Sequence, residues 1–428
     1  MIPKLPFKSR VNFWALAMLM LFLPISKVAA SAALLVLIFL IFLPPYNFPK
    51  SLFTKNRHIW ALASMLIILS LSLLYSANWQ EGWKLIYQHN AFLLIPLVFV
   101  LNKKVVAKKG KILLLLFIIG VLFNTLVTVS FYFLPDELAA NTVTNLGFLK
   151  PYIGKAKHFN YGLYSPFMER IQLSNMMALA VFCCMYLFAI RYKRLLVSTL
   201  IIVLVFGSLF IGGRAGQLGM FIGACVFLII ALFNYLYPKW KRKFGKKHAF
   251  FFASGLVLLL VLSPYVLYKG FPPVSKRYGQ LQWELNEYYN GIERDYKHLT
   301  TVRRIVSWQN SWEIVKKNPI FGVGIGDYYA EMEQQYKQQG SLGLPVDLHN
   351  QYLYYWASTG IIGLLVFVSI MLLWLYKLNS KKQAIYLFAC AFLSCYGLVF
   401  IVDATLQFQI DIMAFSTFFS LIPFLNGK

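Results

Sequence analysis

The stretch of sequence that decides the fold is LLVSTLIIVLVFGSLFIGGRAGQLGMFIGACVFLIIALFNYLY, residues 195–237. It consists of two apolar runs, 195–211 and 215–237. Each run is close to the length of about 20 residues that an α-helix needs to cross a hydrocarbon core of ~30 Å. The two runs meet at the short sequence GGRAG, residues 212–216. Because glycine allows a tight turn, this stretch predicts a hairpin of two membrane-spanning helices.

The same pattern extends over the rest of the chain. Of its 428 residues, 59% are hydrophobic and 13% are charged, which is about half the charge of a soluble domain. A soluble globular protein is therefore excluded. We expect an all-α, polytopic transmembrane bundle of about 12 spans, near residues 11–26, 28–43, 58–75, 83–101, 112–133, 168–190, 195–211, 215–237, 249–268, 350–376, 383–402 and 404–425.

The charged residues orient these predicted helices. With twelve spans and the N-terminus inside, 24 of the 41 basic residues fall on inner segments, whereas all 15 acidic residues fall on the outer side. Cytoplasmic loops of membrane proteins carry an excess of Lys and Arg, so we expect both termini in the cytoplasm. The net charge of +26 is then explained by topology. Membrane lipids are expected partners, and nucleic acid is not.

The predicted spans divide the chain into a transmembrane region of about nine spans, a large outer loop and a second transmembrane region of about three spans: 1–268, 269–348 and 349–428. A shorter outer loop is expected at 134–167. The large loop contains apolar side chains that recur at helical spacing: Ile305, Trp308, Trp312 and Val315. This spacing predicts an amphipathic helix over the outer membrane surface.

Three arginines stand where the chain could hold an anion. Arg214 lies in the turn between two spans, and no carboxylate is near it in sequence. Arg303 and Arg304 precede Trp308, and Arg304 is one helical turn from that indole, so the two side chains can stack. A guanidinium donates two parallel hydrogen bonds to a phosphate and stays protonated. The alternative for each arginine is contact with lipid headgroups.

His349 is the most informative single residue. It opens the apolar run 350–376 and should stand at the outer N-terminus of a transmembrane helix. The positive end of the helix dipole disfavours the imidazolium form, and a neutral ring is what a general base requires. The alternative is a histidine that caps the helix or lies at an interface.

Glycines at 322, 324 and 326 imitate a phosphate-binding loop. No strand precedes them, and they lie on the predicted outer side, where nucleotides are scarce. We interpret this sequence as a tight turn near the membrane surface, with Asp327 capping the helix that follows.

The sequence lacks the motifs that several kinds of enzyme chemistry require. The chain contains no DxD, HExxH, GxSxG or Walker A pattern, and its five cysteines all lie inside apolar runs. We therefore expect no metal site and no cofactor. A secondary transporter or a flippase is a competing class, but it would place ionisable groups near the membrane midplane. Here they cluster at span ends, and only Asp403 and Asp411 are ambiguous.

The short motifs follow one order along the chain. They are Gly213-Arg214-Ala215-Gly216, Arg304-x-x-x-Trp308, Pro319, Gly322-x-Gly324-x-Gly326, and His349-Asn350-x-x-Leu353 followed by Gly360 and Gly363. This order, with its spacing and its common outward side, resembles the O-antigen ligase and O-antigen polymerase superfamily.

The resemblance implies a reaction and a place for it. A glycan would pass from an undecaprenyl-pyrophosphate carrier to an acceptor glycolipid, lipid A-core or similar, on the periplasmic side of the bacterial inner (cytoplasmic) membrane. Arg214 and Arg304 would hold the pyrophosphate, with Arg303 as the alternative to Arg304. His349 would activate the acceptor hydroxyl, and no metal would be needed.

Three further residues are expected to support this site. Asn350 would orient the loop beside the histidine, Trp308 would accompany the arginine pair, and Arg170 would be a weaker third cation because Glu169 stands directly before it.

A repeat-unit polymerase on the same carrier would share the donor, the motifs and the topology. Some polymerases carry an Arg-x₁₀-Gly pattern in their loops. No glycine stands at that spacing after Arg277, Arg294, Arg303 or Arg304. This absence favours the ligase.

Overall fold

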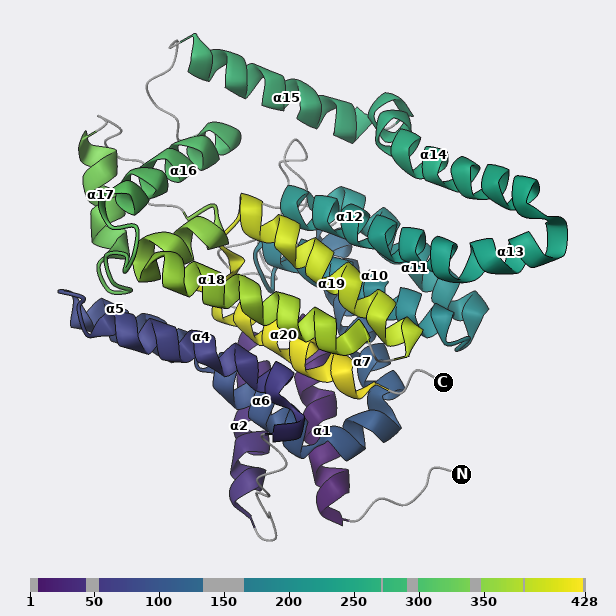
Figure 1. The fold of residues 1–428 in the computed structure, drawn as a ribbon, viewed down its shortest axis with the longest axis horizontal. Helices are drawn as coiled ribbons and strands as arrows, with labels where there is room; N and C mark the ends of the chain where they lie inside the picture. The colour runs from purple at the N-terminus through teal and green to yellow at the C-terminus, as the bar shows by residue number, and fades with distance from the viewer. Residues whose placement is uncertain are drawn as a thin grey trace.

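The structure is a computed structural model that describes residues 7–43, 54–133, 165–270, 272–290, 299–338, 348–379 and 382–425. These ranges form helices and contain no strand (Figure 1). The prediction of an all-α protein is therefore confirmed. Most of the predicted outer loop 134–167 lies outside the described residues, as do 291–298 and 339–347 of the large loop.

The helices follow the predicted apolar runs. Up to residue 270 they are α1 (Phe7–Phe22), α2 (Lys27–Phe42), α4 (Arg57–Leu73), α5 (Trp79–Gln88), α6 (Ala91–Leu101), α7 (Lys103–Phe133), α10 (Arg170–Ala189), α11 (Arg194–Ile211), α12 (Arg214–Ala231), the π-helix η3 (Leu232–Leu236), α13 (Tyr237–Phe244) and α14 (Lys246–Gly270). The predicted loop forms α15 (Pro272–Tyr289), α16 (Thr300–Lys317) and α17 (Tyr328–Gln338). The C-terminal region forms α18 (Gln351–Asn379), α19 (Gln383–Val402), η5 (Thr405–Gln407), α20 (Gln409–Leu421) and η6 (Ile422–Phe424).

Within the described ranges, seven helical segments are long and apolar enough to cross a membrane: Trp79–Leu101, Lys103–Ser130, Arg170–Ala189, Arg194–Ile211, Arg214–Phe244, Gln351–Leu378 and Gln383–Val402. Three further apolar helices are shorter: Lys27–Phe42, Arg57–Leu73 and Gln409–Phe424. The chain is therefore a multi-pass membrane protein, as predicted. The total of about twelve spans stays a prediction.

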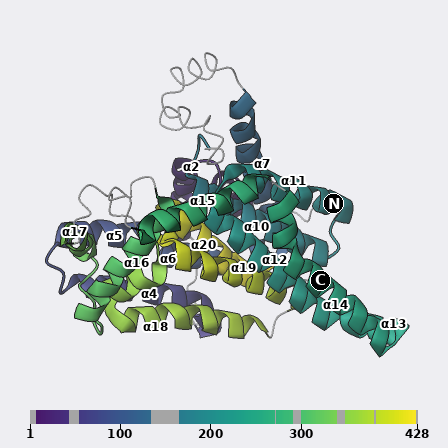
Figure 2. The same cartoon turned by 90° about the horizontal axis from the view of Figure 1, so that it is seen from above.

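Helix α10 lies at the centre of the bundle. All its residues from Gln172 to Leu187 are buried, because α7, α11, α12 and α19 pack around it. Helix α19 lies between α10 and α12 on one side and α18 on the other (Figure 2). A helix that is apolar on every face is expected in such a buried position. The core of the bundle therefore sits directly behind the N-terminus of α10.

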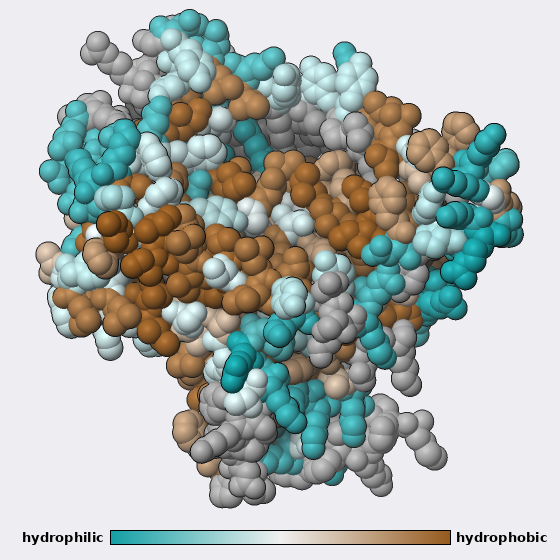
Figure 3. Space-filling model, viewed as in Figure 1, coloured by the Kyte–Doolittle hydropathy of each residue, from teal (hydrophilic) through white to brown (hydrophobic). Residues whose placement is uncertain are grey.

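Helix α18 has the opposite distribution, with one face outside the protein core. Leu365, Leu372 and Leu373 on this helix are more than half exposed. Figure 3 shows apolar residues across the middle of this side of the molecule and hydrophilic residues above and below them. A continuous exposed apolar surface is unusual for a soluble monomer and suits contact with lipid tails.

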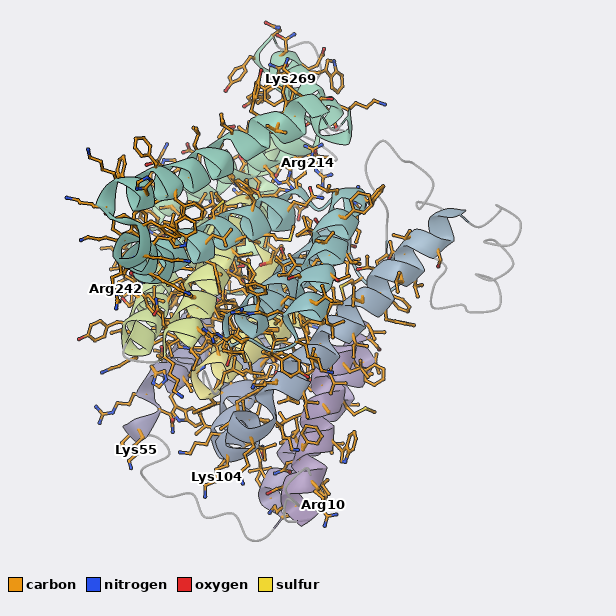
Figure 4. All side chains as sticks on the ribbon, turned by 90° about the vertical axis from the view of Figure 1, so that its right-hand side faces the viewer. Arg10, Lys55, Lys104, Arg214, Arg242 and Lys269 are labelled. Carbon is orange, nitrogen blue, oxygen red and sulfur yellow. The ribbon has the colours of Figure 1, made fainter. Side chains whose placement is uncertain are left out.

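The labelled basic residues in Figure 4 separate into two groups. Arg10, Lys55, Lys104 and Arg242, all predicted to be cytoplasmic, lie along the lower and left margins of that view, whereas Arg214 and Lys269 lie at its top. The predicted orientation requires this separation, and the orientation itself stays a prediction.

The glycine turn after α16 attaches the α16–α17 pair to the membrane helices. Gly322 has φ of 72°, and a Cβ atom there would lie 2.6 Å from the carbonyl oxygen of Ala357 in α18. The Val323 N–H donates to the same carbonyl oxygen at 2.9 Å. Gly360, with φ of 72°, forms a kink in α18, and a Cβ atom there would collide with the backbone of Ile320. Only glycine permits this approach at both positions.

The interpretation of 322–326 as a structural turn agrees with these contacts, but the role expected for Asp327 was wrong. Its carboxylate does not cap α17, the helix that follows. The Ala77 and Asn78 N–H groups donate to its two oxygens at 2.7 and 2.8 Å, just before α5. The reason is tertiary, because the turn brings Asp327 to the end of α4, where these donors have no helical partner.

We predict that Gly360→Ala destabilises the protein. The positive φ alone costs about 1–2 kcal/mol for a residue with a Cβ atom, and the collision with the Ile320 backbone adds to it. Thermal unfolding of the purified protein should therefore shift to a lower midpoint. Gly397→Ala is the matched control, because its Cβ would lie 3.7 Å from the nearest atom, in ordinary contact. An equal midpoint for both variants would contradict the prediction.

Candidate active site

A cavity of about 320 Å³ opens where the N-terminus of α10, helix α17, the start of α18 and the α19–α20 connection meet. Its size falls within the range of small-molecule sites, roughly 300–1,000 Å³. The predicted base belongs to its lining, which consists of Glu169, Ile171, Gln172, Tyr329, Leu348, His349, Asp403, Ala404, Thr405, Gln407, Phe408 and Asp411.

Contacts from three directions hold His349 at the edge of this cavity. Asn350 follows it and caps α18, since its Oδ1 accepts the Leu353 N–H at 2.9 Å. The Trp308 indole N–H on α16 donates to the His349 carbonyl oxygen at 2.6 Å. The ring nitrogen Nδ1 lies 3.9 Å from Oδ1 of Asp403, which follows α19. The histidine therefore couples α16, α18 and α19.

The surroundings of His349 favour the neutral ring. Burial has the largest effect and lowers its pKa below the ordinary value. The Asp403 carboxylate raises the pKa, and Arg304 and Arg303 lower it again, but burial prevails. In a neutral imidazole one ring nitrogen carries a hydrogen and the other can accept a proton. This is the state that a general base requires.

The two neighbouring arginines of α16 have different partners. The Nε of Arg304 donates to the Val402 carbonyl oxygen at 3.2 Å, at the C-terminal end of α19. Within the described ranges no other hydrogen bond or ion pair uses this guanidinium, so its two Nη groups are available to a ligand. Arg303 instead lies within electrostatic reach of Tyr336 on α17, and burial lowers its pKa. Of the two, Arg304 has the side chain that can bind an anion.

The expected stacking of Arg304 on Trp308 was wrong. Each side chain bonds a different part of the membrane bundle: Arg304 bonds the end of α19, and Trp308 bonds the segment before α18. One turn of helix brings the two residues to the same face of α16, but these partners decide where each side chain points. Trp308 supports the histidine rather than the arginine.

Arg214 is held by a chain of hydrogen bonds to the start of α16. Its Nη2 donates to Gln280 Oε1 at 2.8 Å, and Gln280 Nε2 donates to Glu284 Oε1 at 2.9 Å. Glu284, which is fully buried, accepts from the Thr300 hydroxyl at 3.3 Å and from the Thr301 N–H at 2.5 Å. A carboxylate at a helix N-terminus is favourable. This series of hydrogen bonds therefore links Arg214, at the start of α12, to α16, the helix that carries Arg304.

The glycines around Arg214 bring it close to α10. The Ser174 hydroxyl donates to the Gly213 carbonyl oxygen at 2.8 Å. A Cβ at Gly213 would lie 2.7 Å from the Arg170 carbonyl oxygen, and one at Gly216 would lie 2.5 Å from Ser174 Oγ. The predicted hairpin turn is therefore present, and it places Arg214 and Arg170 at adjacent helix ends.

Arg170 is the first residue of α10, and Glu169 precedes it as the N-cap. Glu169 forms a capping box with Gln172 and also lines the cavity. The Glu169 side chain therefore caps the N-terminus of α10 and also forms part of the cavity wall. Arg170 itself does not belong to the cavity lining.

Three residues line this cavity that were not predicted as site residues: Asp403, Asp411 and Gln407. The positions of Asp403 and Asp411 in the sequence could have indicated a functional site, because carboxylates between two apolar runs are costly unless they face a polar cavity. No sequence feature indicated a functional role for Gln407. Within the described ranges, no group of three or more His, Cys, Asp or Glu side chains is arranged to hold a metal ion.

A comparison with known families bears on this geometry. Residues 199–368 match a family model described as O-antigen ligase. These residues belong to the O-antigen ligase superfamily. A curated protein of Haemophilus influenzae (strain ATCC 51907 / DSM 11121 / KW20 / Rd), described as an uncharacterized protein, is 25% identical over 226 residues, which are 50% of this chain and 53% of the relative. The chain thus spans about half the length of that relative.

The O-antigen ligase region contains most of the predicted site. It includes Arg214, both arginines of α16, Trp308 and His349. It ends within α18, so Asp403 and the α19–α20 connection lie beyond it. The resemblance inferred from the sequence is confirmed over 199–368, and the roles of individual residues stay predictions.

We predict that Glu284→Ala loosens the start of α16. The substitution removes the acceptor for the Thr301 N–H and for Gln280. Leaving such donors unsatisfied costs about 1–3 kcal/mol. Limited proteolysis should cleave the α15–α16 segment faster than in the natural protein. Gln282→Ala, an exposed position of the same helix, is the control, and equal cleavage of the two variants would contradict the prediction.

Proposed function

We propose that this protein is a glycosyltransferase of the O-antigen ligase type, which moves a glycan from an undecaprenyl-pyrophosphate carrier to an acceptor sugar at the periplasmic face of the bacterial inner membrane. One observation carries the proposal: His349 lines a cavity together with carboxylates, and it lies within electrostatic reach of the arginines of α16. The membership of residues 199–368 in the superfamily supports it.

The arginines would stabilise the leaving group. When the bond between the glycan and the pyrophosphate breaks, negative charge develops on the phosphate oxygen. Fixed guanidinium groups in a water-poor site stabilise such charge strongly, and one well-placed donor is worth about 2–4 kcal/mol. Arg304, anchored at Val402 with its Nη groups available, fits this role, and the chain from Arg214 to α16 would hold the second cation.

The histidine would prepare the nucleophile. The acceptor hydroxyl oxygen attacks the anomeric carbon of the donor glycan, and its proton passes to Nε2 of His349. The bond from that carbon to the pyrophosphate oxygen breaks, and undecaprenyl pyrophosphate leaves with the electron pair. Asp403, 3.9 Å from Nδ1, would stabilise the imidazolium that forms, and solvent later removes its proton.

A polymerase would use the same chemistry with a carrier-linked repeat unit as acceptor. The glycans of cells that lack the protein distinguish these functions. We expect long chains that remain on the carrier, the result for a ligase. Single repeats on the final acceptor would indicate a polymerase, and accumulation in the cytoplasm would indicate a flippase.

We predict that His349→Ala and His349→Gln abolish transfer but still bind the donor. A general base contributes about 10²–10⁴-fold, so turnover should fall by that factor. The measurement uses purified protein in lipid nanodiscs, with lipid-linked glycan as donor, and records binding and transfer separately. Arg304→Lys is the comparison variant and should lose donor binding, because Lys cannot form the bidentate contact. Natural turnover in either histidine variant would remove His349 as the base.

We predict an acidic limit of activity that follows the pKa of His349. The base works only when neutral, so activity should rise with pH and reach half its maximum below the ordinary histidine value of about 6.5, since burial lowers this pKa. Asp403→Asn removes a charge that raises it, so the limit should move to lower pH. The exposed Glu333→Gln is the control. A shift of the Asp403→Asn profile to higher pH would contradict the assignment.

A further inference from the structure

The connection between α19 and α20 is a polar segment inside the bundle. Helix α19 ends at Val402, one turn of 3₁₀-helix covers Thr405–Gln407, and α20 begins at Gln409. Asp411 is fully buried, Thr405 is 1% exposed and Gln407 is 8% exposed. Polar side chains in such positions normally have hydrogen-bond partners.

The polar atoms of this segment lack partners within the described part of the chain. These atoms are Oδ2 of Asp403, Oγ1 of Thr405, both side-chain polar atoms of Gln407 and both carboxylate oxygens of Asp411. Gln172 and Asn175 lie near Asp411, but neither of its oxygens accepts a hydrogen bond of ordinary geometry. Each unsatisfied buried group destabilises the folded protein. Several such groups in one segment therefore call for a ligand that satisfies them together.

All four side chains line the same cavity as His349. An ionised carboxylate accepts hydrogen bonds and cannot donate them. The Gln407 amide and the Thr405 hydroxyl can do both. A ring with several hydroxyl groups matches this set, because each hydroxyl also donates and accepts. The Phe408 side chain in the same lining offers an apolar surface for the C–H face of such a ring.

The charges of the cavity restrict the ligand further. Glu169, Asp403 and Asp411 contribute to its lining, and no lysine or arginine of the described residues does. The α16 arginines act on His349 from outside this lining. An anionic sugar in the cavity would face like charges, which disfavour it. A neutral or cationic sugar would not.

We propose that the α19–α20 connection is the subsite for the acceptor sugar ring, where Thr405, Gln407 and Asp411 bind its hydroxyls, and that it selects a neutral or amino sugar over an acidic one. This inference rests on the proposed function, because it takes the ring to be the one whose hydroxyl His349 deprotonates. The site would then hold phosphates at the arginines and the neutral or amino sugar ring of the acceptor at the carboxylates.

Direct sugar binding without a donor tests the subsite independently of transfer. The probes are methyl glycosides of glucose and galactose, the matching 2-amino sugars and the matching uronic acids. Saturation-transfer NMR on the protein in nanodiscs measures their binding. We expect the neutral or amino sugars to bind and the uronic acids to bind at least about tenfold more weakly, a difference of about 1.4 kcal/mol.

Two variants locate the binding. Gln407→Leu should weaken binding by about tenfold. It should still fold, because the Gln407 amide lies near Tyr354 but forms no hydrogen bond of ordinary geometry within the described chain. Gln335→Leu is the matched control: Gln335 is 4% exposed and its Nε2 also lacks a partner, but it does not line the cavity.

The outcomes separate this inference from the proposed function. Sugar binding that persists in His349→Gln and falls in Gln407→Leu supports the subsite, even if His349 proves not to be the base. Equal binding by Gln407→Leu and the natural protein would overturn it. Uronic acids that bind as tightly as neutral sugars, or no binding of any probe, would overturn it as well.

Discussion

The close contact between the glycine turn 322–326 and the kink of α18 at Gly360 fixes the position of the α16–α17 pair on the membrane helices. Helix α16 reaches the bundle through Arg304 at the end of α19 and Trp308 at the His349 carbonyl oxygen. Both bonds need the backbone of the turn to lie directly against α18. A side chain at Gly360 would therefore disturb the candidate site although it is eleven residues from His349.

Positive and negative side chains occupy different parts of this site. The arginines of α16 act on His349 electrostatically but do not line the cavity, whereas carboxylates do. The opposing effects of Asp403 and the arginines on its pKa partly cancel, so burial decides the protonation state. Unsatisfied polar atoms in the cavity reduce the stability of the bundle. Such local costs are typical of functional sites, where binding rather than folding determines the side chains.

The sequence by itself determined the fold class and the order of the parts. Apolar runs longer than a core helix require membrane-spanning helices, because unsatisfied backbone groups are too costly in lipid. The glycines around Arg214 and at 322–326 predicted turns, since only glycine tolerates these backbone positions. Arg304 and His349 could be named because a permanent cation and a neutral base at span ends have recognisable chemistry. These signals are local, and short stretches of sequence contain them.

The tertiary structure alone decided which residues meet. Asp403 lies 54 residues after His349 in the chain, and no spacing rule joins them until α18 and α19 pack side by side. The partner of Trp308, the use of Asp327 at the α4–α5 turn and the link from Arg214 to Glu284 depend on the same packing. Helical periodicity predicts the face of a helix on which a residue stands. It does not predict the partner, because that depends on the positions of the other helices in three dimensions.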